Sequence, residues 1–218
     1  MALQLVERHG VVTREAVLAE GVVGGYAAVY GVLKVLEERG QVRRGYFVSG
    51  LGAAQFALPG AVDRLRLVRE RADEAIGSTG AIAAPVVLAA TDPAQPYGAT
   101  LTWPESAGRP ARTAAALVVL RDGVPIAWYD RRSHHLVTFP HTLDDRSWAQ
   151  ALADLVRAGR LRRVEVRKVD GEPLPTSPFN AEIPAAAKAA GYTDGYRGLQ
   201  YTERPSSADR GSSGGPRR

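Results

Sequence analysis

Four aspartates stand where a carboxylate could do chemistry. Asp92 follows an apolar run and lies in the string Ala-Thr-Asp-Pro-Ala-Gln-Pro-Tyr-Gly, with Tyr97 and Trp103 close by in the sequence. On a loop held by a rigid sheet, such a carboxylate could activate water or stabilise a cationic transition state. Asp-Pro is also a common turn pair, so turn formation is the alternative interpretation of Asp92. The other candidate carboxylates are Asp130, Asp170 and Asp194.

The histidines raise the question of a metal site. His134 and His135 are adjacent in a strand-like segment, with His141 a little further along. Neighbouring residues on a strand point to opposite faces, so these two rings cannot readily share one ion. Ser133-His134-His135 is superficially similar to a hydrolase set, but Ser133 lacks the glycines of a nucleophile elbow. We therefore expect no metal and no cofactor in this chain.

The elements that must carry these residues begin with a helical region, residues 1–76. Three helical patterns end at Gly10, Gly21 and Gly40, and Thr13 can cap the second of them. A strand pair is expected over 41–48, bending at the glycine in its centre. Three helices and a basic hairpin within about 50 residues indicate a winged helix-turn-helix domain. A further helix is expected over 61–76.

The apolar spacing assigns an inward face to each of these helices. In the first helix it comprises Leu3, Leu5 and Val6, and in the second Ala16, Val17 and Leu18. In the third it comprises Ala28, Val29, Val32, Leu33, Val35 and Leu36.

Exposed residues of the third helix and the wing could bind nucleic acid. In a winged helix the third helix usually enters the major groove, and the wing contacts the backbone or the minor groove. The candidates on the helix are Tyr26, Tyr30 and Lys34, and those on the wing are Arg43, Arg44 and Tyr46. No acidic residue lies between Glu38 and Asp63, so the wing forms a positive patch. The alternatives are a protein-binding module and a merely solvated hairpin.

After a linker at 77–85, the hydrophobic period changes to that of short strands. Strands are expected at 85–89, 115–120, 126–129, 136–139, 164–169 and 198–201, and helices from Asp144 or Asp145 to Gly159 and at 180–190. Asp122-Gly123 and Asp170-Gly171 have the form of hairpin turns. Trp103, Trp128 and Trp148 fall within these patterns and are expected in the core. The whole predicts an α+β fold: a winged helix (1–76), a linker (77–85), a β-rich, barrel-like domain (86–204) and a disordered tail (205–218).

Composition is that of an ordinary globular chain. The 218 residues are 45% hydrophobic and 23% charged, and the formal net charge of +5 permits an anionic partner without requiring one. The absence of cysteine excludes disulfides, thiolate metal sites and cysteine nucleophiles. There is no apolar run of about 18 residues and no signal-peptide pattern, so we expect a cytoplasmic protein without membrane contact.

Four long strings resemble the C-terminal part of the bacterial large helicase-related (Lhr) family. They are residues 8–66, LAATDPAQPYGATLTWP, GRPARTAAALVVLRDG and AAGYTDGYRGLQ. The resemblance implies an ATP-dependent DNA-repair helicase whose motor lies upstream. It also implies a winged helix followed by a β-barrel-like module, an architecture similar to that of AlkZ/YcaQ-type DNA glycosylases. Some relatives are associated with the removal of uracil from DNA.

The chain departs from the complete family because it contains no GxxxxGK[ST] phosphate-binding loop. It therefore cannot be the helicase motor, and we interpret it as a DNA-binding accessory end. Its expected partners are single-stranded or forked DNA and the upstream helicase domains, with a homo-oligomer as a further possibility. The alternatives are a uracil-type glycosylase that uses a carboxylate such as Asp92 and a scaffold that does not bind nucleic acid. Gln55 invites comparison with a catalytic glutamine of AlkZ-type enzymes, but Ala57 replaces the second polar residue, which favours a structural role for Gln55.

Overall fold

The computed structural model describes residues 1–77 and 83–203. Most of the predicted linker and the whole predicted tail lie outside the described residues. The described residues form two compact units. The N-terminal unit holds the described residues of 1–84 together with 90–103 and 111–113, and the C-terminal unit holds the rest. In the described part of the chain, no helix is both long and apolar enough to cross a membrane.

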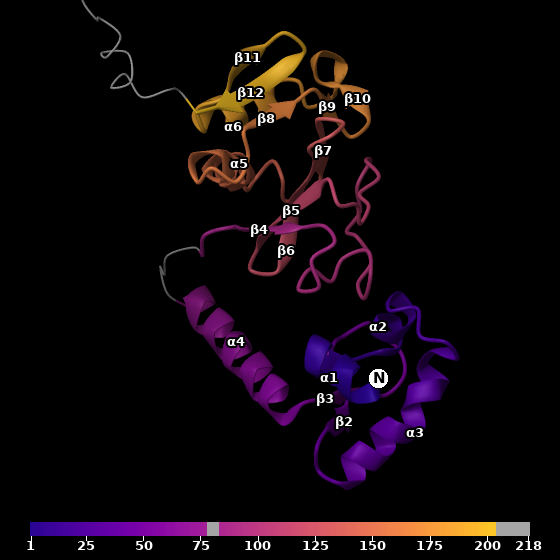
Figure 1. Cartoon of the computed structure of the whole chain (residues 1–218). Coiled ribbons are helices and arrows are strands. Elements are labelled where there is room, and N and C mark those ends of the chain that lie inside the picture. Colours follow the sequence, from indigo (N-terminus) through magenta and orange to yellow (C-terminus); the bar gives the residue numbers. More distant parts are fainter. Residues whose placement is uncertain (78–82, 204–218) are drawn as a thin grey trace, which may run out of the picture. The chain divides into compact units, whose positions relative to one another are not determined.

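The N-terminal unit contains a winged helix, coloured indigo to purple in Figure 1. Its elements in chain order are α1 (Ala2–His9), β1 (Val11–Val12), α2 (Arg14–Ala19), α3 (Gly25–Glu38), β2 (Arg43–Gly45), β3 (Gln55–Ala57) and α4 (Pro59–Gly77). Thr13 begins α2 as predicted, because its Oγ1 accepts a hydrogen bond from the backbone N of Ala16 at 3.0 Å. The three short strands form one antiparallel sheet in the order β1-β3-β2.

Two expectations about this domain were wrong in detail. The partner of β2 is β3 rather than residues 46–48, so the wing is the β2–β3 hairpin with a longer loop that spans 46–54. The following residues, which were expected inside, are exposed: Leu3, Leu18, Ala28, Val32 and Val35. Each is adjacent in sequence to a buried residue of its helix, so its side chain points away from the buried face. In α3 the buried face consists of Val29, Leu33 and Leu36.

The described residues of the C-terminal unit form two sheets, two α-helices and one 3-10 helix. The larger sheet has six strands in the order β10-β9-β7-β6-β5-β4, and the smaller has three in the order β11-β12-β8. The elements are β4 (Val86–Ala89), β5 (Ala116–Arg121), β6 (Val124–Asp130), β7 (His135–Thr138), α5 (Ser147–Arg157), β8 (Arg163–Val166), β9 (Lys168–Val169), β10 (Glu172–Pro173), the 3-10 helix η1 (Leu174–Thr176), α6 (Glu182–Ala189), β11 (Thr193–Gly195) and β12 (Gly198–Thr202). The fold class is therefore α+β as predicted. The expected barrel is not closed in the described residues, because the two edge strands of the larger sheet, β10 and β4, do not pair with each other.

One core joins both sheets, and α5 provides much of it. Figure 1 shows α5 beside the smaller sheet, and the helix contacts β4 and β5 of the larger sheet as well as β8 and β12 of the smaller. Trp148 on α5 and Trp128 on β6 are buried as expected. Trp103 instead stacks on Tyr97, with ring centroids 6.0 Å apart, in the loop that follows β4.

The predicted turns are confirmed, but one predicted strand divides in two. Asp122-Gly123 joins β5 to β6, and Asp170-Gly171 joins β9 to β10. Residues 164–169, expected as a single strand, form β8 in the smaller sheet and β9 in the larger. Arg167 lies at the break, where its backbone N donates to the carbonyl of His134 at 2.9 Å. The chain thus changes sheets at Arg167.

Candidate nucleic-acid interfaces

The wing is fixed from beneath by a buried glutamine. Gln55 has no exposed surface, and its Oε1 accepts hydrogen bonds from the backbone N of Phe47 and of Val48, both at 2.8 Å. Its Nε2 donates to the carbonyl of Val48 at 2.9 Å. The structural role expected for Gln55 is therefore confirmed.

The three wing candidates are exposed, but their charges are not equally available. Tyr46 is 82% exposed, and Arg43 and Arg44 both point to solvent. The Nε of Arg44 lies 3.3 Å from Oε1 of Glu37 on α3, so part of its charge is neutralised. Arg43 has no such ion pair among the described residues. Arg43 and Tyr46 are thus the wing side chains best placed for an anionic, base-bearing ligand.

Of the three candidates on α3, the structure exposes only Lys34. Tyr26 and Tyr30 are half-buried against the domain core, and Tyr30 meets Phe56 edge-on with ring centroids 5.8 Å apart. The Tyr26 hydroxyl donates to the carbonyl of Ala54, and burial raises the pKa of Tyr26 to about 12. Both tyrosines, expected at the surface, therefore support the wing from below.

Asp92 lies in a turn of the loop that follows β4. Its Oδ1 accepts from the backbone N of Ala94 at 2.8 Å, and its carbonyl accepts from Arg112 at 3.2 Å. Arg112 also donates to the carbonyl of Gln95 at 2.6 Å, and the buried Gln95 amide donates to the carbonyl of Tyr97 at 3.0 Å. These bonds give the Asp92 carboxylate the geometry of a turn residue.

Two of the other aspartates also accept hydrogen bonds within the fold, Asp130 from a near neighbour and Asp170 from a residue on β7. Asp130 accepts from the backbone N of Arg132 at 2.7 Å. Asp170 accepts from the backbone N and the hydroxyl of Thr138, at 2.8 and 2.5 Å. Asp194 differs, because its side chain is 76% exposed and pairs with Lys188 at 2.9 Å. It is also the one aspartate of the four that lines the cavity described next.

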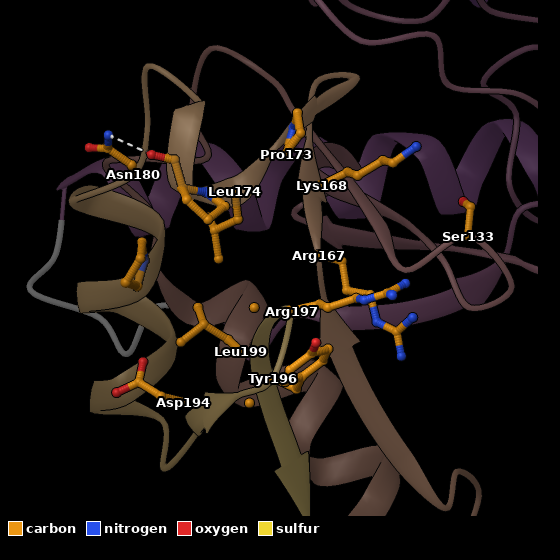
Figure 2. A pocket seen from close by; sticks show the side chains of 14 residues that line it. Ser133, Arg167, Lys168, Pro173, Leu174, Asn180, Asp194, Tyr196, Arg197 and Leu199 are labelled. Carbon is orange, nitrogen blue, oxygen red and sulfur yellow. Dashed lines mark hydrogen bonds between the residues drawn. The ribbon is translucent and has the colours of Figure 1, made fainter.

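A cavity of about 680 Å³ opens between η1, α6 and the β11–β12 hairpin. Figure 2 shows Leu174 and Leu199 beside it, with Asn180 and Asp194 toward one side and the basic side chains toward the other. Its charged lining consists of Arg167, Lys168, Arg197 and Asp194. Cations therefore outnumber carboxylates on its wall.

A buried carboxylate positions Arg167 at this wall. Glu165 is 8% exposed, and its Oε2 accepts from Nε of Arg167 at 2.8 Å. Its Oε1 lies 3.0 Å from Nε of Arg163. Two guanidinium groups thus share one carboxylate, and of these three groups Arg167 is the one that lines the cavity.

The two adjacent histidines lie in different local settings. His134 occupies a turn with a φ of 56°, while Nε2 of His135 accepts from the backbone N of Gly171 at 2.8 Å. Among the described residues, no group of three or more His, Cys, Asp or Glu side chains could hold an ion. Burial lowers the pKa of both imidazoles, and the nearby Arg167 cation adds to the effect at His134.

These lowered pKa values predict that the chain loses stability in mild acid. A histidine that is neutral in the fold contributes fully above the unfolded pKa of about 6.5, and its contribution is lost as the pH falls toward the folded value. Protonation of Nε2 would also break the bond from Gly171. We expect urea denaturation to show lower stability at pH 5.5 than at pH 7.5, with a smaller difference in His135→Gln. The control is a variant of the exposed His141, which should show the same stability difference between the two pH values as the wild-type chain. A wild-type difference in His135→Gln, or a reduced difference in the His141 variant, would contradict the assignment of the effect to His135.

Comparison with known proteins identifies the family. Residues 1–76 match the winged-helix domain of the large helicase-related protein. The chain is 44% identical over 202 residues to a Mycolicibacterium smegmatis protein named "Lhr helicase/probable uracil glycosylase", with 90% of the chain and 13% of that protein covered. It is 38% identical over 125 residues to the Escherichia coli "Lhr helicase/uracil glycosylase", with 56% of the chain and 8% of that protein covered. The chain belongs to the Lhr family and corresponds to a C-terminal region of it. It spans about one eighth of the length of these Lhr relatives, or less.

Sequence reasoning missed the basic residues of this Lhr cavity. Arg167 and Lys168 were hidden in a predicted continuous strand, and Tyr196 and Arg197 in a short connection between β11 and β12. A signal was present, because Gly-Tyr-Arg-Gly places an aromatic and a cation side by side in a tight hairpin. Only the fold brings that hairpin to Arg167, which precedes it by some thirty residues.

Proposed function

We propose that this chain is a DNA-binding accessory module of an Lhr-type helicase, acting with motor domains that lie elsewhere. The observation that carries the proposal is the wing, where Arg43 on β2 and Tyr46 on the following loop are exposed and Gln55 fixes that loop. The family membership supports DNA as the ligand. We further propose that residues 1–76 and 86–204 act as separate domains, and that the wing binds single-stranded or forked DNA.

Removing the wing charges should weaken DNA binding and reduce its dependence on salt. We expect Arg43→Ala/Arg44→Ala to lower affinity about tenfold at low salt, and to lower the slope of log K against log salt by about 1 for each lost phosphate contact. Because Glu37 partly neutralises Arg44, Arg43→Ala should account for most of the loss. Fluorescence anisotropy with a labelled forked oligonucleotide measures both quantities.

The matched control is Arg66→Ala, which removes an exposed arginine of α4 that faces Asp63 at 3.7 Å. It should leave affinity and salt slope unchanged. Equal losses in the control and the wing variants would indicate general charge attraction and contradict a role for the wing. Binding that is independent of salt in the wild-type chain would contradict the proposal as a whole.

The C-terminal cavity supports a second candidate function, uracil-DNA glycosylase activity. Two relatives carry uracil glycosylase in their names, and the cavity is lined by the carboxylate of Asp194 on one side and, on the other, by cations that could hold a DNA backbone. Such an enzyme needs a pocket for a flipped base and a carboxylate that stabilises an oxocarbenium-like sugar or activates water. Asp194 and the earlier candidate Asp92 are therefore both to be tested.

The test is incubation of the chain with a labelled single strand that carries one uracil, followed by hot alkali and a denaturing gel. Glycosylase activity predicts a cut at the uracil that is lost in either Asp194→Asn or Asp92→Asn. The variant that keeps activity serves as the control for the other. An intact strand with the wild-type chain would reject this function and leave DNA binding by the wing unaffected.

A further inference from the structure

We propose that the β11–β12 hairpin and its cavity form a second DNA-binding site that holds one nucleotide of a single strand, with the base stacked on Tyr196. The inference rests on DNA being the ligand of this chain, but not on the wing. It concerns binding alone and requires no bond to be broken.

The hairpin tip has the composition of a stacking site. The tip residue Tyr196 is 97% exposed, the highest exposure among the large hydrophobic and aromatic side chains of the described residues. The guanidinium carbon of Arg197 lies 5.7 Å from the centre of the Tyr196 ring. An exposed aromatic ring with a cation beside it offers a face for a base and a charge for the adjoining phosphate.

The hairpin is held firmly enough to present that ring. β12 pairs with β8, placing Leu199 opposite Val166. A Cβ atom on Gly198 would lie 2.1 Å from the carbonyl oxygen of Val166, so the two backbones approach as closely as only glycine allows. A ring on a fixed hairpin loses little conformational entropy when a base stacks on it.

The wall beside the hairpin suits a phosphate group. In the view of Figure 2 the guanidinium groups of Arg167 and Arg197 lie close together beside Tyr196. Glu165 fixes Arg167, and the backbone N of Lys168 donates to the carbonyl of His134 at 3.3 Å. Lys168 and Arg197 form no ion pair with a carboxylate among the described residues, so their charges can meet an anion.

The rest of the cavity suits a base. Buried Leu174 and Leu199 provide an apolar floor. Asn180, whose Nδ2 donates to the carbonyl of Pro175 at 3.3 Å, keeps an amide oxygen that can accept from the edge of a base. A volume of about 680 Å³ lies in the range of pockets that hold small organic ligands. The arrangement as a whole therefore fits a nucleotide better than a bare anion or an apolar ligand.

The test uses the full chain and a short oligo-dT strand that carries one 2-aminopurine, whose fluorescence falls when it stacks on an aromatic ring. We expect quenching with the wild-type chain. Tyr196→Ala should abolish it and weaken binding about fivefold or more, whereas Tyr196→Phe should preserve both. Because the ring is almost fully exposed, Tyr196→Ala should unfold at the wild-type temperature.

Arg43→Ala/Arg44→Ala separates this site from the wing. If quenching persists in that variant and is lost in Tyr196→Ala, the second site is established independently of the wing. If Tyr196→Ala binds and quenches like wild type while the wing variant loses affinity, the hairpin proposal is overturned and the wing proposal stands. Absence of quenching in the wild-type chain, despite binding, would also overturn the hairpin proposal.

Discussion

Gly198→Ala is expected to cause the largest loss of stability of any conservative change in the C-terminal unit. The new Cβ would lie 2.1 Å from the carbonyl oxygen of Val166, and the backbone φ of 150° is one that an L side chain rarely adopts. Overpacking costs about 1–3 kcal/mol and backbone strain about the same, so we expect a loss of roughly 3 kcal/mol or more. β12 would have to move away from β8, and the hairpin that bears Tyr196 would move with it.

Urea denaturation followed by tryptophan fluorescence measures this loss, because Trp128 and Trp148 both lie in the C-terminal unit. The control is Gly123→Ala, a hairpin glycine with a φ of 81° whose added Cβ would meet nothing within 4 Å. It should show the backbone strain alone, about 1 kcal/mol. If Gly198→Ala were no less stable than Gly123→Ala, the close approach of β12 to β8 would be refuted.

Gln55→Leu is expected to disrupt the wing more than any change of its exposed residues. Leucine has about the right size but cannot accept from the backbone N of Phe47 and Val48 or donate to the carbonyl of Val48. Two unpaired backbone donors cost about 1–3 kcal/mol each, which predicts a loss of at least about 2 kcal/mol. The wing should then lose its fixed shape, and DNA affinity should fall as in Arg43→Ala/Arg44→Ala.

Chemical denaturation monitored by circular dichroism gives the stability change, and anisotropy with forked DNA gives the affinity. Gln41→Ala, which removes an exposed glutamine of the same domain, is the matched control and should change neither. A stable Gln55→Leu protein with wild-type affinity would mean that the glutamine does not hold the wing.

Sequence alone determined the elements whose signals are local. Thr13 at the start of α2, and the Asp-Gly turns at 122–123 and 170–171, were predicted because a cap or a tight turn depends on a few neighbouring residues. The winged-helix layout and the α+β class followed from the order of these elements. The structural role of Gln55 was also inferred from the sequence, because Ala57 replaces the second polar residue of the AlkZ-type catalytic motif.

Features that depend on which side of an element is covered were less predictable. Val32 and Val35 continue an apolar pattern along α3, yet only the stripe at Val29, Leu33 and Leu36 meets the core. Tyr26 and Tyr30 were expected to be exposed as candidates on the third helix, which usually enters the major groove. The wing packs over them instead, and the Tyr26 hydroxyl contacts Ala54, which is distant in sequence.

The C-terminal cavity was decided by tertiary structure alone. Residues 164–169 alternate in hydrophobicity as one continuous strand would, and no local feature of the sequence indicates that strand pairing changes at Arg167. There the backbone of Arg167 bonds to His134, β8 pairs with β12, and β9 pairs with β7. Because strand pairing is a long-range choice among many competing partners, the meeting of Arg167, Lys168, Tyr196 and Arg197 is a property of the fold rather than of any one segment.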